Sequence, residues 1–147
     1  MWIKLLVVIS TLLIFSACSD EKQTTEPVKV EKKETYGIPW EKDFPSAFAK
    51  AKKENKKLMV MAVSEGCRWC DKMKENTLSN PAVTKKLKNY ILVQADRETP
   101  HERDKLPEFK HVPIIFFMKP NKEVIDNLRG YFAPDDFLEY LNEMDDI

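Results

Sequence analysis

The sequence predicts an α/β fold in which a central mixed sheet of four or five strands is covered by helices on both faces. Three apolar runs of strand length, at residues 58–63, 90–95 and 114–118, alternate with segments that have helical spacing. Unbroken apolar runs are typical of strands that are buried on both faces. Alternation of strands and helices favours parallel pairing, whereas a short turn after the third run makes the last two strands antiparallel.

Helical segments separate these strands. Apolar residues at helical spacing from Phe44 to Ala51 predict a first helix that ends near Asn55. Asn80 can cap another helix, because Pro81 suits the first helical position. Both signals are local, so we expect these two helices to begin and end where the sequence indicates.

Two further helical segments, a fourth strand and a final helix complete the pattern. One helix is expected over about residues 67–76, and the polar segment 99–110 is expected to be partly helical. The fourth strand covers residues 123–128 after a turn. Pro134 begins the last helix, which we expect to point three apolar side chains inward: Phe137, Leu138 and Leu141.

The first 17 residues have the pattern of a targeting segment. Lys4 precedes an apolar run at residues 5–15, long enough for a signal-peptide core but short of the roughly 20 residues that span a bilayer. Small residues then precede Cys18, in a pattern that resembles a bacterial lipoprotein box. That resemblance implies that Cys18 carries lipid; an ordinary signal peptide or an uncleaved anchor stays open. All three interpretations predict export.

Three segments with different roles follow from this pattern. Residues 1–17 are predicted to be a lipoprotein-type signal peptide, residues 18–35 a flexible polar tether, and residues 36–147 the globular domain. The tether contains almost no large apolar side chain, so it cannot bury enough surface to fold. The 24 basic and 24 acidic residues balance, and this gives no field that favours nucleic acid as a partner.

Two cysteines lie three residues apart at the start of a predicted helix. This spacing puts Cys67 and Cys70 on one helix face, close enough for a disulfide. Unpaired N–H groups and the positive end of the helix dipole favour a thiolate at Cys67, and Arg68 adds positive charge, whereas Glu65 and Asp71 oppose it. We therefore expect a lowered pKa for the thiol of Cys67. Cys67 is predicted to be the attacking nucleophile, and the more buried Cys70 the resolving thiol.

Several motifs together resemble the thioredoxin superfamily, and in particular its exported single-domain thioredoxin-like branch of thiol:disulfide interchange lipoproteins. The resemblance covers about residues 38–145. Its motifs are W-x-x-x-F-x-x-A-x-x-x-A-K from Trp40 to Lys52, C-R-W-C-x-x-M after an apolar strand, Asn80-Pro81-Ala82-Val83, Val112-Pro113 before a strand, and Arg129-Gly130-Tyr131 before the last helix. The resemblance implies a thioredoxin-like fold.

The resemblance also implies a peptide-binding surface beside the cysteines. It implies a cis peptide bond at Pro113 facing the disulfide, which leaves the backbone of Val112 free to pair with a substrate peptide. Trp69, between the cysteines, is expected to offer an apolar face to the partner. Thioredoxins usually keep a buried acid where this sequence has Met61, so a proton acceptor would have to come from elsewhere, such as Glu65.

Other interpretations of the cysteine pair find less support. Zinc needs at least three protein ligands, and only His101 and His111 are available at a wide spacing, so we expect no metal site. Covalent haem needs histidine where the sequence has Asp71. A purely structural disulfide stays open, although so short a loop gains little stability from a cross-link.

The sequence thus predicts a thiol–disulfide oxidoreductase that acts on exported protein cysteines, with the reductive direction favoured. It would need no cofactor beyond the Cys67–Cys70 disulfide. We expect a monomer on the periplasmic side of a bacterial membrane, lipid-anchored at Cys18 or else soluble, which a membrane thiol-disulfide transporter or oxidase resets. The alternative is a non-redox peptide-binding or chaperone-like module.

Overall fold

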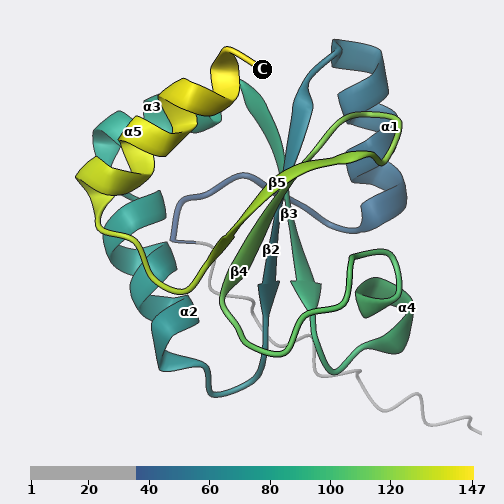
Figure 1. Cartoon of the computed structure of the whole chain (residues 1–147), viewed down its shortest axis with the longest axis horizontal. Helices are drawn as coiled ribbons and strands as arrows, with labels where there is room; N and C mark the ends of the chain where they lie inside the picture. The colour runs from purple at the N-terminus through teal and green to yellow at the C-terminus, as the bar shows by residue number, and fades with distance from the viewer. Residues whose placement is uncertain (1–35) are drawn as a thin grey trace, which may run out of the picture. The chain divides into compact units, whose positions relative to one another are not determined.

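A five-stranded mixed sheet lies at the centre of the computed structural model, which describes residues 36–147 (Figure 1). The strand order is β1-β3-β2-β4-β5. The bounds are Trp40–Glu41 for β1, Lys57–Val63 for β2, Tyr90–Asp96 for β3, Ile114–Met118 for β4 and Val124–Arg129 for β5. Both β1 and β2 pair with β3 in parallel, whereas β4 pairs antiparallel with β2 and β5. The predicted mixed sheet is therefore confirmed.

The predicted signal peptide at residues 1–17, the tether at residues 18–35 and the lipidation candidate Cys18 lie outside the described residues. From residue 36 onward, no helix combines the length and the apolar character that a membrane crossing requires.

Helices cover both faces of the sheet, as predicted (Figure 1). One face carries α1 (Phe44–Glu54) and α4 (Pro100–Arg103). The other face carries α2 (Arg68–Lys72), the π-helical turn η1 (Met73–Leu78), α3 (Pro81–Leu87) and α5 (Pro134–Asp145). The chain passes from β2 to β3 through α2, η1 and α3, so the cysteine pair lies at the carboxyl end of a central strand.

Local capping signals fix the ends of α1 and α3 where the sequence predicts them. The Asp43 side chain accepts a hydrogen bond from the Ser46 N–H at 2.8 Å, and Asn55 ends α1 in the left-handed conformation. The Asn80 side chain accepts from the backbone N–H groups of Ala82 and Val83 at the start of α3. The Asn80 cap confirms the predicted start of α3, whereas α1 was predicted from its apolar spacing and its Asp43 cap was not.

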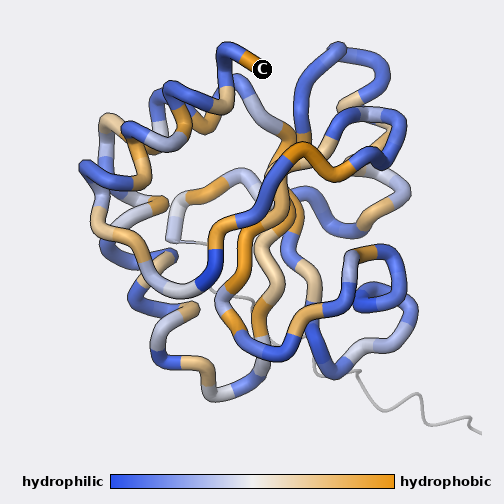
Figure 2. Tube along the Cα trace, in the orientation of Figure 1, coloured by the Kyte–Doolittle hydropathy of each residue, from blue (hydrophilic) through white to orange (hydrophobic). Residues whose placement is uncertain are grey.

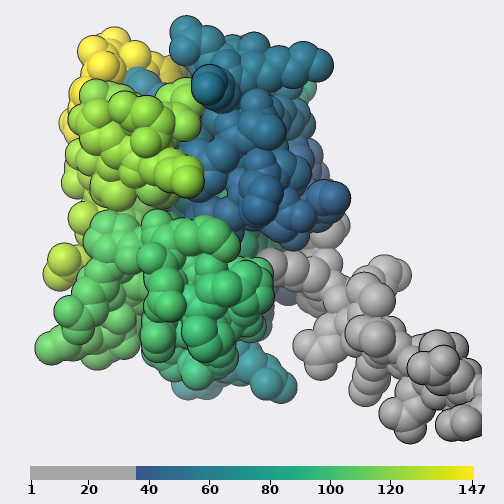
Figure 3. Space-filling view, turned by 90° about the vertical axis from the view of Figure 1, so that its right-hand side faces the viewer, coloured from purple at the N-terminus to yellow at the C-terminus, as the bar shows by residue number. Residues whose placement is uncertain are grey.

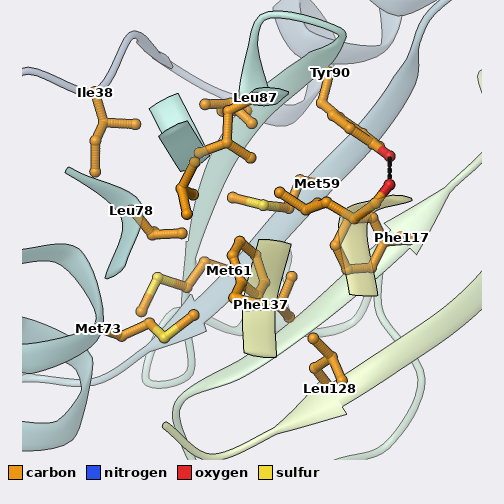
Figure 4. Packing of buried hydrophobic residues seen from close by; sticks show 14 of the residues in the cluster. Ile38, Met59, Met61, Met73, Leu78, Leu87, Tyr90, Phe117, Leu128 and Phe137 are labelled. Atoms are coloured by element: carbon orange, nitrogen blue, oxygen red, sulfur yellow. Dashed lines mark hydrogen bonds between the residues drawn. The ribbon is translucent and has the colours of Figure 1, made fainter. Parts of the chain in front are cut away.

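Two hydrophobic clusters fill the space between the sheet and its helices. Alternate residues of β2 point to opposite faces: Met59 and Met61 belong to one cluster, Val60 and Ala62 to the other. The strands are the most hydrophobic part of the chain trace in Figure 2. Figure 4 shows Phe117 and Phe137 packed with the β2 methionines on the α5 side of the sheet. Burial on both faces accounts for the unbroken apolar runs.

Three details differ from the sequence-based expectation. Strand β1 was not predicted, because two residues carry no alternation pattern and pair with β3 only in the folded chain. The helix after Cys67 does not end at residue 76 but widens into η1, which reaches Leu78. Leu138 is only partly buried, whereas Phe137 and Leu141 are fully buried as expected.

Candidate functional site

The cysteine pair lies where β2 passes into α2. Gly66 adopts a φ of 67° in the turn between them, a left-handed conformation that favours glycine. Cys67 is the N-cap of α2, and its Sγ accepts a hydrogen bond from the Cys70 N–H at 3.1 Å. The two sulfurs are bonded at 2.11 Å, with the Cα atoms 5.2 Å apart. The predicted position of the pair at a helix start is confirmed.

The two sulfurs differ in their access to solvent. Cys70 is 1% exposed and belongs to the hydrophobic cluster beneath α2, whereas Cys67 is partly exposed at the edge of that cluster. The expected difference in burial is therefore present. A thiol must reach a second protein to attack it, so the geometry favours Cys67 as the attacking sulfur.

The peptide bond between Val112 and Pro113 is cis, as the family resemblance implied. The Pro113 carbonyl accepts a hydrogen bond from the Gly130 N–H at 2.8 Å, which joins the segment before β4 to the segment after β5. An open cleft of about 340 Å³ lies between these segments and the cysteine helix, lined by Trp69, Val112, Pro113, Gly130 and Tyr131. The structure thus brings together the three residues that the sequence assigns to substrate binding.

Sequence reasoning did not assign Tyr131 or Lys72 to the site. The ring centroids of Tyr131 and Trp69 lie 5.8 Å apart, and the Lys72 Nζ lies 4.7 Å from the first centroid and 5.0 Å from the second. Tyr131 stands in the R-G-Y motif that supports the family resemblance, and this was the available signal. Lys72 carries no such signal, because a lysine on a helix usually faces solvent.

The proposed tuning residues lie at the surface. Arg68 and Glu65 are both exposed, and neither side chain makes an ion pair or hydrogen bond with the rest of the described chain. Asp71, expected to oppose a Cys67 thiolate, instead forms an ion pair with the largely buried Lys74 at 3.0 Å. The negative charge of Asp71 is thus partly compensated, and this leaves Arg68 as the unpaired cation next to Cys67 in the chain.

Met61 stands at the position that usually holds a buried acid in thioredoxins, and its surroundings in the structure are apolar. Met61 is fully buried in the same cluster as Cys70. Because Glu65 is exposed, it does not supply a buried carboxylate in place of that acid. Proton transfer at Cys70 would therefore involve solvent or substrate groups rather than a buried side chain of β2.

Both histidines are exposed and stand apart from the cysteines in the chain. His101 lies in α4, and His111 lines a separate hollow of about 530 Å³ together with Phe109 and Arg129. Across residues 36–147, no group of three or more His, Cys, Asp or Glu side chains is arranged to hold a metal ion.

Comparisons with known proteins agree with the fold, and the residues that the family model matches include both cysteines. A family model described as thioredoxin-like matches residues 39–120. Anterior gradient protein 3 of Mus musculus is 25% identical over 88% of this chain and 76% of its own length. The thiol:disulfide interchange protein DsbD of Vibrio cholerae is 28% identical over 69% of this chain, but the match covers only 18% of that protein.

A solved structure of a thioredoxin from Thermus thermophilus superimposes with a TM-score of 0.59 and 25% identity, covering 69% of this chain and 82% of that one. The family match spans more than half of the chain and includes β1 to β4, both cysteines and the cis proline. From this match and the shared fold we conclude that the protein belongs to the thioredoxin-like family.

Proposed function

We propose that the protein is a thiol–disulfide oxidoreductase that acts on the cysteines of exported proteins, with reduction of substrate disulfides as the favoured direction. The observation that carries the proposal is a partly exposed sulfur, Cys67, bonded to a buried one, Cys70, beside the cleft at the cis Pro113. The thioredoxin-like fold with such a pair supports thiol–disulfide chemistry in general. Exported substrates and direction belong to the proposal.

In the reductive direction, the thiolate of Cys67 attacks one sulfur of a substrate disulfide. A mixed disulfide forms, the substrate S–S bond breaks, and one substrate thiolate leaves. The thiolate of Cys70 then attacks the Cys67 sulfur, which releases the second substrate thiolate and closes the Cys67–Cys70 bond. Two electrons pass from the enzyme to the substrate, and the two thiol protons of the enzyme balance the two new substrate thiols.

The surroundings of Cys67 suit this first step. The Cys70 N–H that donates to the Cys67 sulfur would stabilise a thiolate there, because an N–H donor stabilises negative charge. Arg68 adds an exposed positive charge nearby in sequence. We assign thiolate tuning to Arg68 and Glu65, in opposite directions.

Substrate binding is assigned to Trp69, Val112 and Pro113, which share the cleft beside the cysteine helix. An extended substrate segment would pair with the Val112 backbone and place its cysteine against Cys67. The dithiol would need no cofactor other than its own disulfide bond.

A redox partner must reset the pair after each turnover. The name of the Vibrio cholerae relative, a thiol:disulfide interchange protein, supports a thiol-disulfide partner in general. We propose a membrane thiol-disulfide transporter or oxidase in this role, and a periplasmic location with lipid at Cys18. A chain made with Cys18→Ser should leave the membrane fraction of the producing bacterium if lipid holds it there, whereas unchanged membrane association would contradict this part of the proposal.

The equilibrium of the Cys67–Cys70 pair with glutathione buffers tests the function. Potentials of related proteins run from about −270 mV for a reductant to about −120 mV for an oxidant. A value near the first supports the reductive direction, and a value near the second reverses it. A pair that does not equilibrate at all contradicts the proposal and favours the peptide-binding alternative, as would a Cys67→Ser, Cys70→Ser chain that keeps its activity in cells.

A trapping experiment tests the assignment of the two cysteines. A Cys70→Ala chain should accumulate mixed disulfides through Cys67, because the resolving step is removed. The matched Cys67→Ala chain should trap much less, since its remaining sulfur is buried. Equal trapping by the two variants would overturn the assignment, and one dominant captured protein would indicate a donor dedicated to one pathway.

A further inference from the structure

We propose that Tyr131 and Lys72 join Trp69 in an aromatic wall, defined by these three residues, that selects target segments with an apolar side chain next to the reactive cysteine. The inference rests on the proposed thiol–disulfide exchange and adds its substrate preference. Tyr131 and Trp69 would contact the target side chain, and Lys72 would act as a positioning residue.

The geometry of the wall links two separate parts of the chain. Trp69 and Lys72 stand three residues apart in α2, and Tyr131 comes from the segment between β5 and α5. The Lys72 Nζ lies within 5.0 Å of both ring centroids, and such contacts between a cation and aromatic faces are attractive. Lys72 thereby holds Trp69 against Tyr131, in a tilted pair with an interplanar angle of 41°.

Exposure of the wall points to a partner. Trp69 is 55% exposed, and across residues 36–147 the only other exposed large apolar side chain is Ile147 at the chain end. A largely exposed aromatic side chain next to a reactive disulfide is typical of a contact surface. The adjoining cleft of about 340 Å³ has apolar side chains from Trp69, Val112, Pro113 and Tyr131. An apolar side chain of the target would be buried there between the aromatic wall and the lining of the cleft.

The positive charge of the wall should add to the preference for an apolar target side chain over a cationic one. Lys72 makes no ion pair with any described carboxylate, whereas the neighbouring Asp71 is paired with Lys74. The exposed Arg68 adds a second cation in the same helix. A lysine or arginine of the target would meet like charge at the wall, so the site would disfavour it.

Matched disulfide peptides test the inference on the full chain. The residue directly before or directly after the peptide cysteine is leucine, serine or lysine, and kcat and KM are measured separately for each peptide. We expect kcat/KM for the leucine peptide to exceed that for the serine peptide by about threefold to tenfold, mainly through KM, and the lysine peptide to be poorest. Tyr131→Ala and Lys72→Gln should bring the leucine-to-serine ratio close to one.

Conservative and distant variants serve as controls. Tyr131→Phe keeps the ring and Lys72→Arg keeps the cation, so both should retain the ratio. Lys122→Gln removes a comparable cation contact, at 5.7 Å from the Phe48 ring, in the turn between β4 and β5. That turn lies beside α1 on the face shown in Figure 3, at the end of β4 away from Pro113, so Lys122→Gln should not change the ratio.

The outcomes separate this inference from the proposed function. Exchange of the wild-type chain with oxidised glutathione together with equal kcat/KM for all peptides overturns the inference and leaves the function standing. A wild-type chain that does not exchange with oxidised glutathione overturns both. Lys72 is exposed, so Lys72→Gln should fold even if Tyr131→Ala does not. An unchanged ratio in Lys72→Gln would contradict the positioning role.

Discussion

At the scale of single residues, the charges near Cys67 are few and lie mostly in water. Arg68 and Glu65 are exposed, and the Asp71 carboxylate is engaged by Lys74. Exposed charges interact weakly because solvent and salt screen them. The fixed Cys70 N–H should therefore stabilise the Cys67 thiolate more than either neighbouring side chain does, while the side chains adjust its reactivity.

We expect Arg68→Gln to move the midpoint of Cys67 alkylation to higher pH by a fraction of a unit, since it removes a cation that favours the thiolate. Glu65→Gln should move the same midpoint to lower pH. The measurement is the alkylation rate of the reduced chain against pH at low and high salt. A shift of the wrong sign, or one that does not shrink with salt, would contradict the tuning roles.

Tyr90 gives the chain a defined response to alkaline pH. Burial, followed by its hydrogen bond to Asp145, raises the pKa of Tyr90 well above its usual value. A raised folded-state pKa gives stability that is complete below the unfolded value of about 10 and is lost as pH rises above it. Unfolding in denaturant should therefore become easier above about pH 10. Tyr90→Phe should reduce this loss of stability. Burial, followed by the hydrogen bond to Asp126, also raises the pKa of Tyr140, so Tyr140 should account for part of the loss that remains. If stability fell with pH equally steeply in Tyr90→Phe and in the wild-type chain, the assignment to Tyr90 would be wrong.

At the scale of elements, the features that could be predicted are those whose causes are local. The Asn80 cap and Pro81 lie within the first residues of α3, and the sequence shows both. By contrast, η1 is tied to a distant part of the chain: the Thr77 hydroxyl in η1 donates a hydrogen bond to the Phe132 carbonyl at 2.5 Å. The contact between Tyr131 and Trp69 likewise joins residues far apart in the chain. For this reason the sequence predicted the cysteines and the proline but not the full cleft.

The cap of α3 can be measured directly. Asn80→Ala removes the acceptor for the Ala82 and Val83 N–H groups and should lower the free energy of unfolding by about 1 kcal/mol. Asn89→Ala, an exposed position just after α3 whose side chain has no hydrogen bond to the described chain, is the matched control and should have little effect. Equal losses in the two variants would show that the cap contributes nothing specific.

At the scale of the whole described domain, the two hydrophobic clusters share the strands between them. Phe117 packs into the cluster under α5, and its neighbour Phe116 packs into the one under α1. The same strand backbone carries side chains of both clusters. If one cluster came apart and the strand lost its backbone hydrogen bonds, the side chains on its other face would lose their positions as well. We therefore expect the clusters to unfold together.

Phe116→Ala and Phe117→Ala should each lower the free energy of unfolding by about 3–5 kcal/mol. In both variants, tryptophan fluorescence and far-ultraviolet circular dichroism should report the same midpoint in denaturant. Separate midpoints for the two probes would instead show that one face of the sheet can melt on its own.

The edges of the sheet carry one more consequence. Strand β1 is only two residues long, and β5 borders the sheet on the other side with the exposed charges of Asp126 and Arg129. The pairing of β5 with β4 is also irregular, at Phe117 and Met118 of β4. Short, charged or irregular edges resist aggregation by strand addition. A domain whose proposed task is to bind extended chains beside an open cleft thus has sheet borders that discourage those same chains from assembling into fibrils.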